Sequence, residues 1–253
     1  MKLKRFVYAS DNHGNLVDEA AAGACFEFTN WFKPDFRIHG GDLRDNACLR
    51  GGASEDEQQQ PLDEDWDKAE WFSENFFGAR GKNILLQGNH DFPRIERLLN
   101  AQGNTLRARG SRELGERLVD EHDALMKSLK VLDIPYDSRL GVFEMGPLRA
   151  IHGIHHNEYA AKKHAEIYGN VIHGHIHRPQ THRPRSLDGS FGQASGCLCD
   201  LDPPYMMKNT SKLAWKHGFL YGFVDEQGTG PDDFIVYEAA KIGNKWMFPT
   251  EIQ

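Results

Sequence analysis

The sequence predicts an α/β fold in which a sheet carries functional side chains at the carboxyl ends of its strands. Short apolar runs alternate with stretches of helical spacing along most of the chain. Five of the apolar runs lead into short blocks that combine glycine with aspartate, asparagine or histidine. Open α/β sheets place their active sites at such strand ends. The blocks are Ser10–Asn15, Gly40–Asp42, Gly88–Asp91, Ile151–Gly153 and Gly174–His177.

The elements follow one another without an internal repeat. Apolar runs bounded by turn residues predict strands, spacing with one apolar face predicts helices, and the chain ends in a β-rich tail. Strands are expected at 3–9, 36–38, 84–86, 141–145, 148–151, 171–172, 219–224, 233–238 and 245–248, and helices at 17–32, 66–77, 93–99, 111–132 (with Ser111 as a possible cap) and 157–168.

We expect a single domain over residues 1–253 with two insertions. Residues 46–64 are rich in glycine, glutamine and acidic side chains, so we expect a flexible insertion. It is either a rim or lid beside the site or a disordered surface segment. The second insertion, at about 93–132, is helical. Its leucine stripe is either core or, less favoured, a dimer face.

Composition describes a soluble globular chain. It has 253 residues, a mean hydropathy of −0.62 and no apolar run near the roughly 20 residues of a membrane helix. The basic start is followed by too few apolar residues for a signal peptide, so a cytoplasmic location is expected. Four cysteines do not make a disulfide framework in a chain of this length. The sequence does not indicate the oligomeric state.

The five blocks contain seven side chains of metal-ligating type. Asp11 and His13 are two residues apart, so both can point to one side of an extended loop, and His175 and His177 share this spacing. Asp42 has two carboxylate oxygens and can bridge two ions. Mixed imidazole, carboxylate and amide ligands suit manganese, iron or zinc. The predicted ligands are Asp11, His13, Asp42, Asn89, His152, His175 and His177.

From about residue 4 to 200 these blocks resemble the calcineurin-like metallophosphoesterase family. The resemblance implies a four-layer αββα sandwich of two mixed β-sheets flanked by helices. It implies two divalent metal ions, with manganese expected to serve in vitro. The first ion would take Asp11, His13, Asp42 and His177, and the second would take Asp42, Asn89, His152 and His175.

The same resemblance implies the catalytic residues and the reaction. A hydroxide that bridges the ions would attack phosphorus in line with the leaving oxygen. His90 would donate a proton or stabilise charge, and Asp91 would orient it. Arg44 and Arg178 are candidate substrate contacts. Arg178 begins a basic run, to Arg185, that is either a phosphate cradle or a solvated loop.

The motifs favour a phosphodiesterase over a protein phosphatase. Ser10–Asn15 resembles the small phosphodiesterases of the family, and Gly88–Asp91 with Gly174–His177 is shared with repair exonucleases. The residues after Asp42 do not complete the G-D-x-x-D-R-G motif of the protein phosphatases. The expected substrate is a small phosphodiester or a nucleic acid. The net charge of −7 disfavours tight nucleic-acid binding, although a metal pair would add positive charge.

Two alternatives remain open at this point. A phosphomonoesterase or nucleotide hydrolase is the first, because two-metal centres often accept both ester types. A non-catalytic metal-binding scaffold is the second, but such a protein would be expected to lack a ligand or the catalytic histidine. Exposed aromatic side chains would favour a nuclease, since bases stack on them. The candidates are Trp66, Trp71, Phe72 and Tyr205, which more often fill cores.

Overall fold

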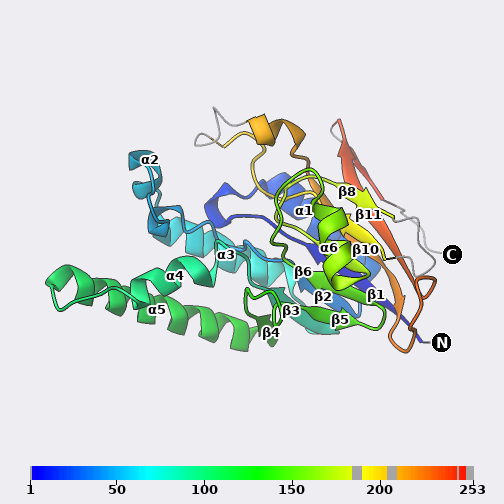
Figure 1. The fold of residues 1–253 in the computed structure, drawn as a ribbon, viewed down its shortest axis with the longest axis horizontal. Helices are drawn as coiled ribbons and strands as arrows, with labels where there is room; N and C mark the ends of the chain where they lie inside the picture. Colours follow the sequence, from blue (N-terminus) through cyan, green and yellow to red (C-terminus); the bar gives the residue numbers. More distant parts are fainter. Residues whose placement is uncertain (1, 184–189, 204–209, 244, 249–253) are drawn as a thin grey trace.

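The computed structural model describes residues 2–183, 190–203, 210–243 and 245–248 (Figure 1). Within these residues the strands form two mixed sheets, with the orders β12-β11-β10-β1-β2-β3-β4 and β5-β6-β7-β9-β8. The strands are β1 Leu3–Ala9, β2 Phe36–His39, β3 Lys82–Leu86, β4 Val131–Ile134, β5 Phe143–Met145, β6 Leu148–Ile151, β7 Val171–His173, β8 Gln180–His182, β9 Gly192–Ala194, β10 Gly218–Asp225, β11 Phe234–Ile242 and β12 Lys245–Met247.

Along the sequence, the helices alternate with groups of these strands. Strands β1 to β4 run parallel to one another, as do β6, β7 and β9, so their carboxyl ends point the same way within each sheet. The helices are α1 Glu19–Phe32, α2 Glu55–Gln58, α3 Leu62–Phe76, α4 Phe92–Leu99, α5 Leu106–Ser128 and α6 Ala160–Tyr168, with 3-10 turns at Gly14–Leu16, Ala47–Leu49 and Thr210–Ala214. In the described part of the chain no helix has the length and apolarity needed to cross a membrane.

The sheets and helices form four layers, as the family resemblance implies. Alternate residues of β1 point to opposite faces of its sheet. Tyr8 belongs to the apolar cluster between the two sheets, where its hydroxyl donates to the Ile151 carbonyl at 2.8 Å. Val7 points the other way, into a cluster with Phe28 of α1 and Phe72 of α3. On the outer face of the second sheet, Ala160 and its neighbours on α6 pack over β9. The αββα prediction is therefore confirmed.

The long helix of the second insertion, predicted at 111–132, begins and ends at other residues in the structure. Helix α5 starts at Leu106, where the Thr105 hydroxyl accepts the Ala108 N–H, and Ser111 is not its cap. It ends at Ser128, and Lys130 has a left-handed φ of 54°. The residues after it form β4, which pairs with β3. Helical spacing alone could not show this, because the pairing depends on a strand more than forty residues away.

The leucine stripe of α5 packs mainly against other elements of the same chain. Leu114 and Leu118 contact Ile95 of α4 and Trp66 of α3, while Leu125 and Leu129 pack on the main core. Leu132, the last of the predicted stripe, lies in β4 and is exposed. The core interpretation of the stripe therefore holds for the helical part. In Figure 1, α4 and α5 extend away from β10 and β11, on the side of β3 and β4.

The first insertion is more regular than the composition suggests. Residues 46–64 contain a 3-10 turn, the short helix α2 and the first turn of α3. A capping box starts α2, since the Ser54 and Glu57 side chains each accept the other's backbone N–H. The segment lies against α4, where Arg97 donates to the Leu49 carbonyl at 2.6 Å.

Strands β8 and β9 were also not predicted, because each has three residues and little apolar pattern.

Candidate metal centre

The sandwich brings all five blocks to the same place. The first three blocks follow β1, β2 and β3 of one sheet, and the last two follow β6 and β7 of the other. The carboxyl ends of these strands therefore meet at one end of the structure, as predicted from the sequence. Among the predicted ligands, Asn89 and His175 are half-buried, and the remaining five are buried. The side chains face one another across the two sheets.

The ligands predicted for the first ion form one group. The ligand atoms of Asp11, His13, Asp42 and His177 all lie within 4.8 Å of one another. His177 Nε2 is 3.0 Å from His13 Nε2 and 3.3 Å from Asp11 Oδ1. His13 Nε2 is in turn 3.7 Å from Asp42 Oδ2. Two imidazoles and two carboxylates thus converge on one small volume.

A second group shares Asp42 with the first. The ligand atoms of Asp42, His152 and His175 also lie within 4.8 Å of one another. His152 Nε2 is 3.4 Å from Asp42 Oδ2 and 3.1 Å from Asn89 Oδ1. The same oxygen of Asp42 therefore faces His13 of the first group and His152 of the second. This is the position that a bridging carboxylate must have.

The backbone is strained where these side chains converge. Five of the predicted ligands have left-handed φ values between 50° and 70°, namely Asp11, His13, Asp42, His175 and His177. Such a conformation costs about 1–3 kcal/mol for a residue other than glycine, and it clusters at functional sites. Two glycines allow the close packing. A Cβ at Gly88 would lie 2.1 Å from Asp42 Oδ1, and one at Gly174 would lie 2.5 Å from Asp11 Oδ2.

These residues fit a pair of divalent cations. Imidazole nitrogens, carboxylate oxygens and one amide oxygen form the donor set that transition metals use at hydrolytic centres. His175 Nδ1 is buried and has no hydrogen-bond partner among the described residues. A buried polar atom of this kind normally has a partner, so the site provides a ligand atom that the protein itself does not satisfy.

Nearby carboxylates favour the protonated form of two histidines of the centre. His152 donates from Nδ1 to the Gly40 carbonyl at 2.7 Å and from Nε2 to Asn89 Oδ1, so both ring nitrogens carry hydrogen. Burial opposes this charge, but the Asp42 carboxylate outweighs it and raises the pKa of His152 to about 9. Burial also opposes the charge on His177, and Asp11 raises its pKa to about 9. A metal ion must displace these protons to bind.

Metal binding should therefore stabilise the protein more strongly as the pH rises. Unfolded histidines lose their protons near pH 6.5, while His152 and His177 keep theirs to about pH 9, so the metal-free protein loses stability across this window. Metal affinity increases over the same window. We expect the increase in Tm on adding Mn²⁺, relative to protein in chelator, to be larger at about pH 8.5 than at about pH 6.5. A constant or shrinking increase would contradict this protonation scheme.

Asp45, which the sequence did not single out, holds the His90 ring in the way that was predicted for Asp91. Asp45 Oδ1 accepts a hydrogen bond from His90 Nδ1 at 2.8 Å and another from His13 Nδ1 at 3.0 Å. Asp91 does not contact the His90 ring. Its buried carboxylate accepts the backbone N–H groups of Gly88, Leu43 and Arg44 and so holds the loop that carries Asp42. Burial and the nearby Asp42 raise the pKa of Asp91.

Arg94 is a second residue that sequence analysis missed. It lies in the first turn of α4, and its side chain is 11% exposed. The guanidinium donates to the Asp45 carbonyl and, at 3.1 Å, to His90 Nε2. Because His90 Nδ1 donates to Asp45, its Nε2 is the acceptor in the contact with Arg94. Neither Asp45 nor Arg94 belongs to one of the five blocks, and no spacing in the chain indicates their contacts with His90.

The two predicted substrate arginines lie in different surroundings. Arg44 is buried away from the ligands, where it donates to His122 Nδ1 at 3.0 Å and stacks on the Trp66 ring at 3.9 Å. Its guanidinium is therefore engaged by side chains of the protein itself, and its contact with a substrate stays a prediction. Arg178 follows His177 and is half-buried, and its Nε has no hydrogen-bond partner among the described residues. Arg178 stays a predicted substrate contact.

The other side chains proposed for nucleic-acid binding are mostly engaged elsewhere. Of the basic run after His177, residues 180–182 form β8, Arg183 lies over the Phe191 ring, and Arg185 is outside the described residues. Trp71 and Phe72 pack against Phe26, and Tyr205 is outside the described residues. The described part of the chain therefore supplies little support for a base-stacking groove.

No family model matches the chain, and no curated protein matches it in sequence. Solved structures do match. A metallophosphoesterase from Sphaerobacter thermophilus is 17% identical, with 94% of this chain and 88% of that chain covered and a TM-score of 0.47. An archaeal phosphodiesterase is 15% identical, with 94% of this chain and 99% of that chain covered and a TM-score of 0.42. The NAD nucleotidase of Haemophilus influenzae is 10% identical, with 99% of this chain and 54% of that chain covered and a TM-score of 0.43.

At these identities and TM-scores, the functions of the matched proteins are not transferred to this chain.

Proposed function

We propose that this chain is a calcineurin-like metallophosphoesterase that uses two divalent metal ions to hydrolyse phosphodiester bonds. The observation that carries the proposal is the position of Asp42, whose Oδ2 faces His13 at 3.7 Å and His152 at 3.4 Å. A carboxylate shared by two complete ligand groups is the arrangement of a dinuclear centre. The substrate is proposed to be a small phosphodiester or a nucleic acid, and manganese, iron or zinc is proposed to occupy the site.

The two ions would supply Lewis acidity, which neutralises the phosphoryl oxygens and acidifies water. The protein's own residues orient the substrate and manage its charge. His90 lies at the mouth of this centre, with Nε2 4.0 Å from Asp42 Oδ2 and the ring held by Asp45. From there, once Nε2 is protonated, the ring can donate a hydrogen bond to a leaving oxygen and stabilise the charge that develops on it.

Arg94 is proposed to bind the phosphoryl group of the substrate. A fork of N–H donors matches the geometry of a phosphate oxygen pair, and the guanidinium already points at His90 Nε2. When Arg94 moves to the substrate it also releases His90 Nε2, which is then free to take up a proton from water and donate it to the leaving oxygen. Arg94 would thus take the role that the sequence had suggested for Arg44.

Replacing Arg94 by alanine should weaken substrate binding and leave the metals in place. A charge-assisted hydrogen bond contributes about 1.5–3 kcal/mol, so kcat/KM should fall roughly 10- to 100-fold. Arg97→Ala is the matched control, since Arg97 lies on the same helix and contacts the Leu49 carbonyl instead. Steady-state kinetics and inhibition by inorganic phosphate measure the effect. Equal kinetics for the Arg94 and Arg97 variants would remove Arg94 from the substrate site.

The proposed activity is tested by a comparison of substrates. Rates with Mn²⁺ would be measured on a generic phosphodiester, a phosphomonoester, and linear single- and double-stranded DNA, with chelator-treated protein as the blank. Metal-dependent diester or DNA cleavage supports the proposal and separates the two substrate classes. Preference for the monoester would favour the phosphomonoesterase or nucleotide hydrolase, and no turnover on any substrate would favour a non-catalytic scaffold.

A further inference from the structure

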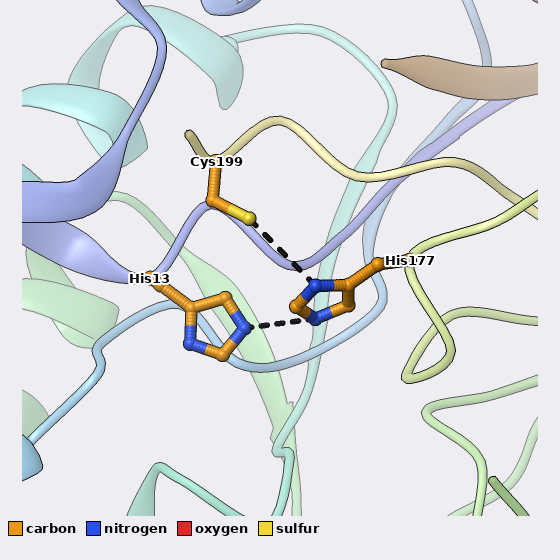
Figure 2. Close-up of side chains that lie close together, drawn as sticks. All are labelled: His13, His177 and Cys199. Carbon is orange, nitrogen blue, oxygen red and sulfur yellow. Dashed lines mark hydrogen bonds between the residues drawn. The ribbon is translucent and has the colours of Figure 1, made fainter. Parts of the chain in front are cut away.

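Three of the metal-site histidines have a hydrogen-bond partner behind the ring, that is, at Nδ1, while Nε2 faces the other ligands. These partners differ in chemistry. Behind His13, Nδ1 donates to the Asp45 carboxylate at 3.0 Å, and behind His152 it donates to the Gly40 carbonyl at 2.7 Å. Behind His177 the partner is a thiol, because Cys199 Sγ lies 3.8 Å from Nδ1 (Figure 2). Metal-binding histidines almost always donate their outer N–H to an oxygen acceptor. A sulfur in this place is unusual.

The sulfur lies behind the ring and not among the ligands. Figure 2 shows the His177 ring between Cys199 and His13, with Nδ1 toward the sulfur and Nε2 toward His13. Nε2 is also the atom that approaches Asp11. Although Cys199, His13 and His177 have ligand atoms within 4.8 Å of one another, an ion held by His177 Nε2 and Asp11 would lie on the opposite side of the ring from Sγ.

Backbone pairing holds the thiol in this position. Backbone hydrogen bonds join the segment that carries Cys199 to the loop of the first block. Leu198 donates its N–H to the Asp11 carbonyl, and Cys199 forms a β-bridge with Val17. On the other side, His217 Nε2 donates to the Cys199 carbonyl at 3.0 Å. Cys199 itself is 2% exposed. The loop that presents Asp11 to the metal therefore also fixes the sulfur that supports His177.

We propose that Cys199 is a positioning residue for the first metal ion, acting by accepting the Nδ1–H of His177. This contact selects the ring tautomer that turns the Nε2 lone pair toward Asp11 and His13. The proposal rests on the dinuclear centre proposed above. It distinguishes the two metal positions, because in the second group the acceptor for His152 Nδ1 is a backbone carbonyl and not a thiol.

Removing the sulfur should weaken the first metal ion selectively. Loss of such a supporting contact typically costs 10- to 100-fold in metal affinity. Cys199→Ala and Cys199→Val both remove the acceptor, and valine preserves most of the buried volume. Cys199→Ser restores an acceptor and should recover most of the affinity. Cys25→Ala is the matched control, because that buried thiol lies in α1 and contacts the Thr29 hydroxyl.

The experiment titrates Mn²⁺ into metal-free full-length protein and reads both dissociation constants, with circular dichroism to confirm folding. Wild type and Cys25→Ala should each bind two ions, with the same two dissociation constants in both proteins. Cys199→Ala and Cys199→Val should each lose about 10- to 100-fold at one position. The loss should recur in a His152→Ala background, where the remaining ion is the one that His177 holds.

The possible failures can be told apart. Wild-type affinity at both positions in the folded Cys199→Val protein would overturn the positioning role while leaving the dinuclear centre intact. The positioning role would also be overturned if Cys199→Ser were as weak as Cys199→Ala, or if the weakened ion were the second one. Wild-type protein that does not bind two ions would overturn the proposed centre itself.

Discussion

Asp42→Asn is expected to abolish tight binding of both metal ions and, with it, hydrolysis. Asp42 Oδ2 faces both ligand groups. Burial opposes the charge on the carboxyl, but His152, His90 and His13 outweigh it and hold the pKa of Asp42 well below its usual range. The group is therefore a carboxylate at any pH at which the protein works. An asparagine keeps the shape but replaces one oxygen by an N–H₂ donor and removes the charge that two cations share.

Metal analysis after dialysis measures this effect directly. We expect two ions per chain in the wild type and fewer than one in Asp42→Asn, with circular dichroism showing the same fold in both. The nearby Asp91→Asn is an informative comparison, because Asp91 holds backbone N–H groups and does not face the ligands. Retention of two tightly bound ions in Asp42→Asn would refute the bridging assignment.

His90→Ala is expected to give the second largest effect, with the rate lowered by ~10²–10⁴ while both ions stay bound. His90 is within 4.0 Å of Asp42 but belongs to neither ligand group that contains Asp42. Its ring is turned by Asp45 so that Nε2 faces Arg94 at the mouth of the centre. A side chain in that place acts on the substrate more than on the ions.

The same variant tests whether His90 is itself a metal ligand. His13, Asp45 and His90 have ligand atoms within 4.8 Å of one another, so this trio has metal-ligand spacing too. If His90 were a ligand, His90→Ala would lose an ion together with its activity. If it acts on the substrate, kcat falls and the metal content does not. Unchanged turnover would remove His90 from the mechanism.

The ligands could be predicted from sequence because each follows a strand in a short motif. Asp11, His13, Asp42 and the later histidines lie within one to four residues of a strand end, so the topology carries them to a common edge. The strands themselves were recognisable because residues such as Val7 and Ile84 lie in short apolar runs. Local pattern and function coincide at these positions.

The supporting residues could not be predicted in this way. Asp45 reaches His90 and Arg94 reaches Asp45 only because two loops from neighbouring strands pack together, and no spacing in the chain reveals that contact. Arg44 had the same local appearance as a substrate arginine, yet its partners His122 and Trp66 lie on distant helices. Strand β4 was hidden for a similar reason, since its apolar residues continue the helical spacing of α5.

The dinuclear centre built around Asp42 is most directly tested by anomalous diffraction from crystals grown with Mn²⁺. We expect two anomalous peaks. One should lie beside Asp11, His13 and His177, the other beside Asn89, His152 and His175, with Asp42 between them. A single peak, or peaks that do not share Asp42, would contradict the proposed centre.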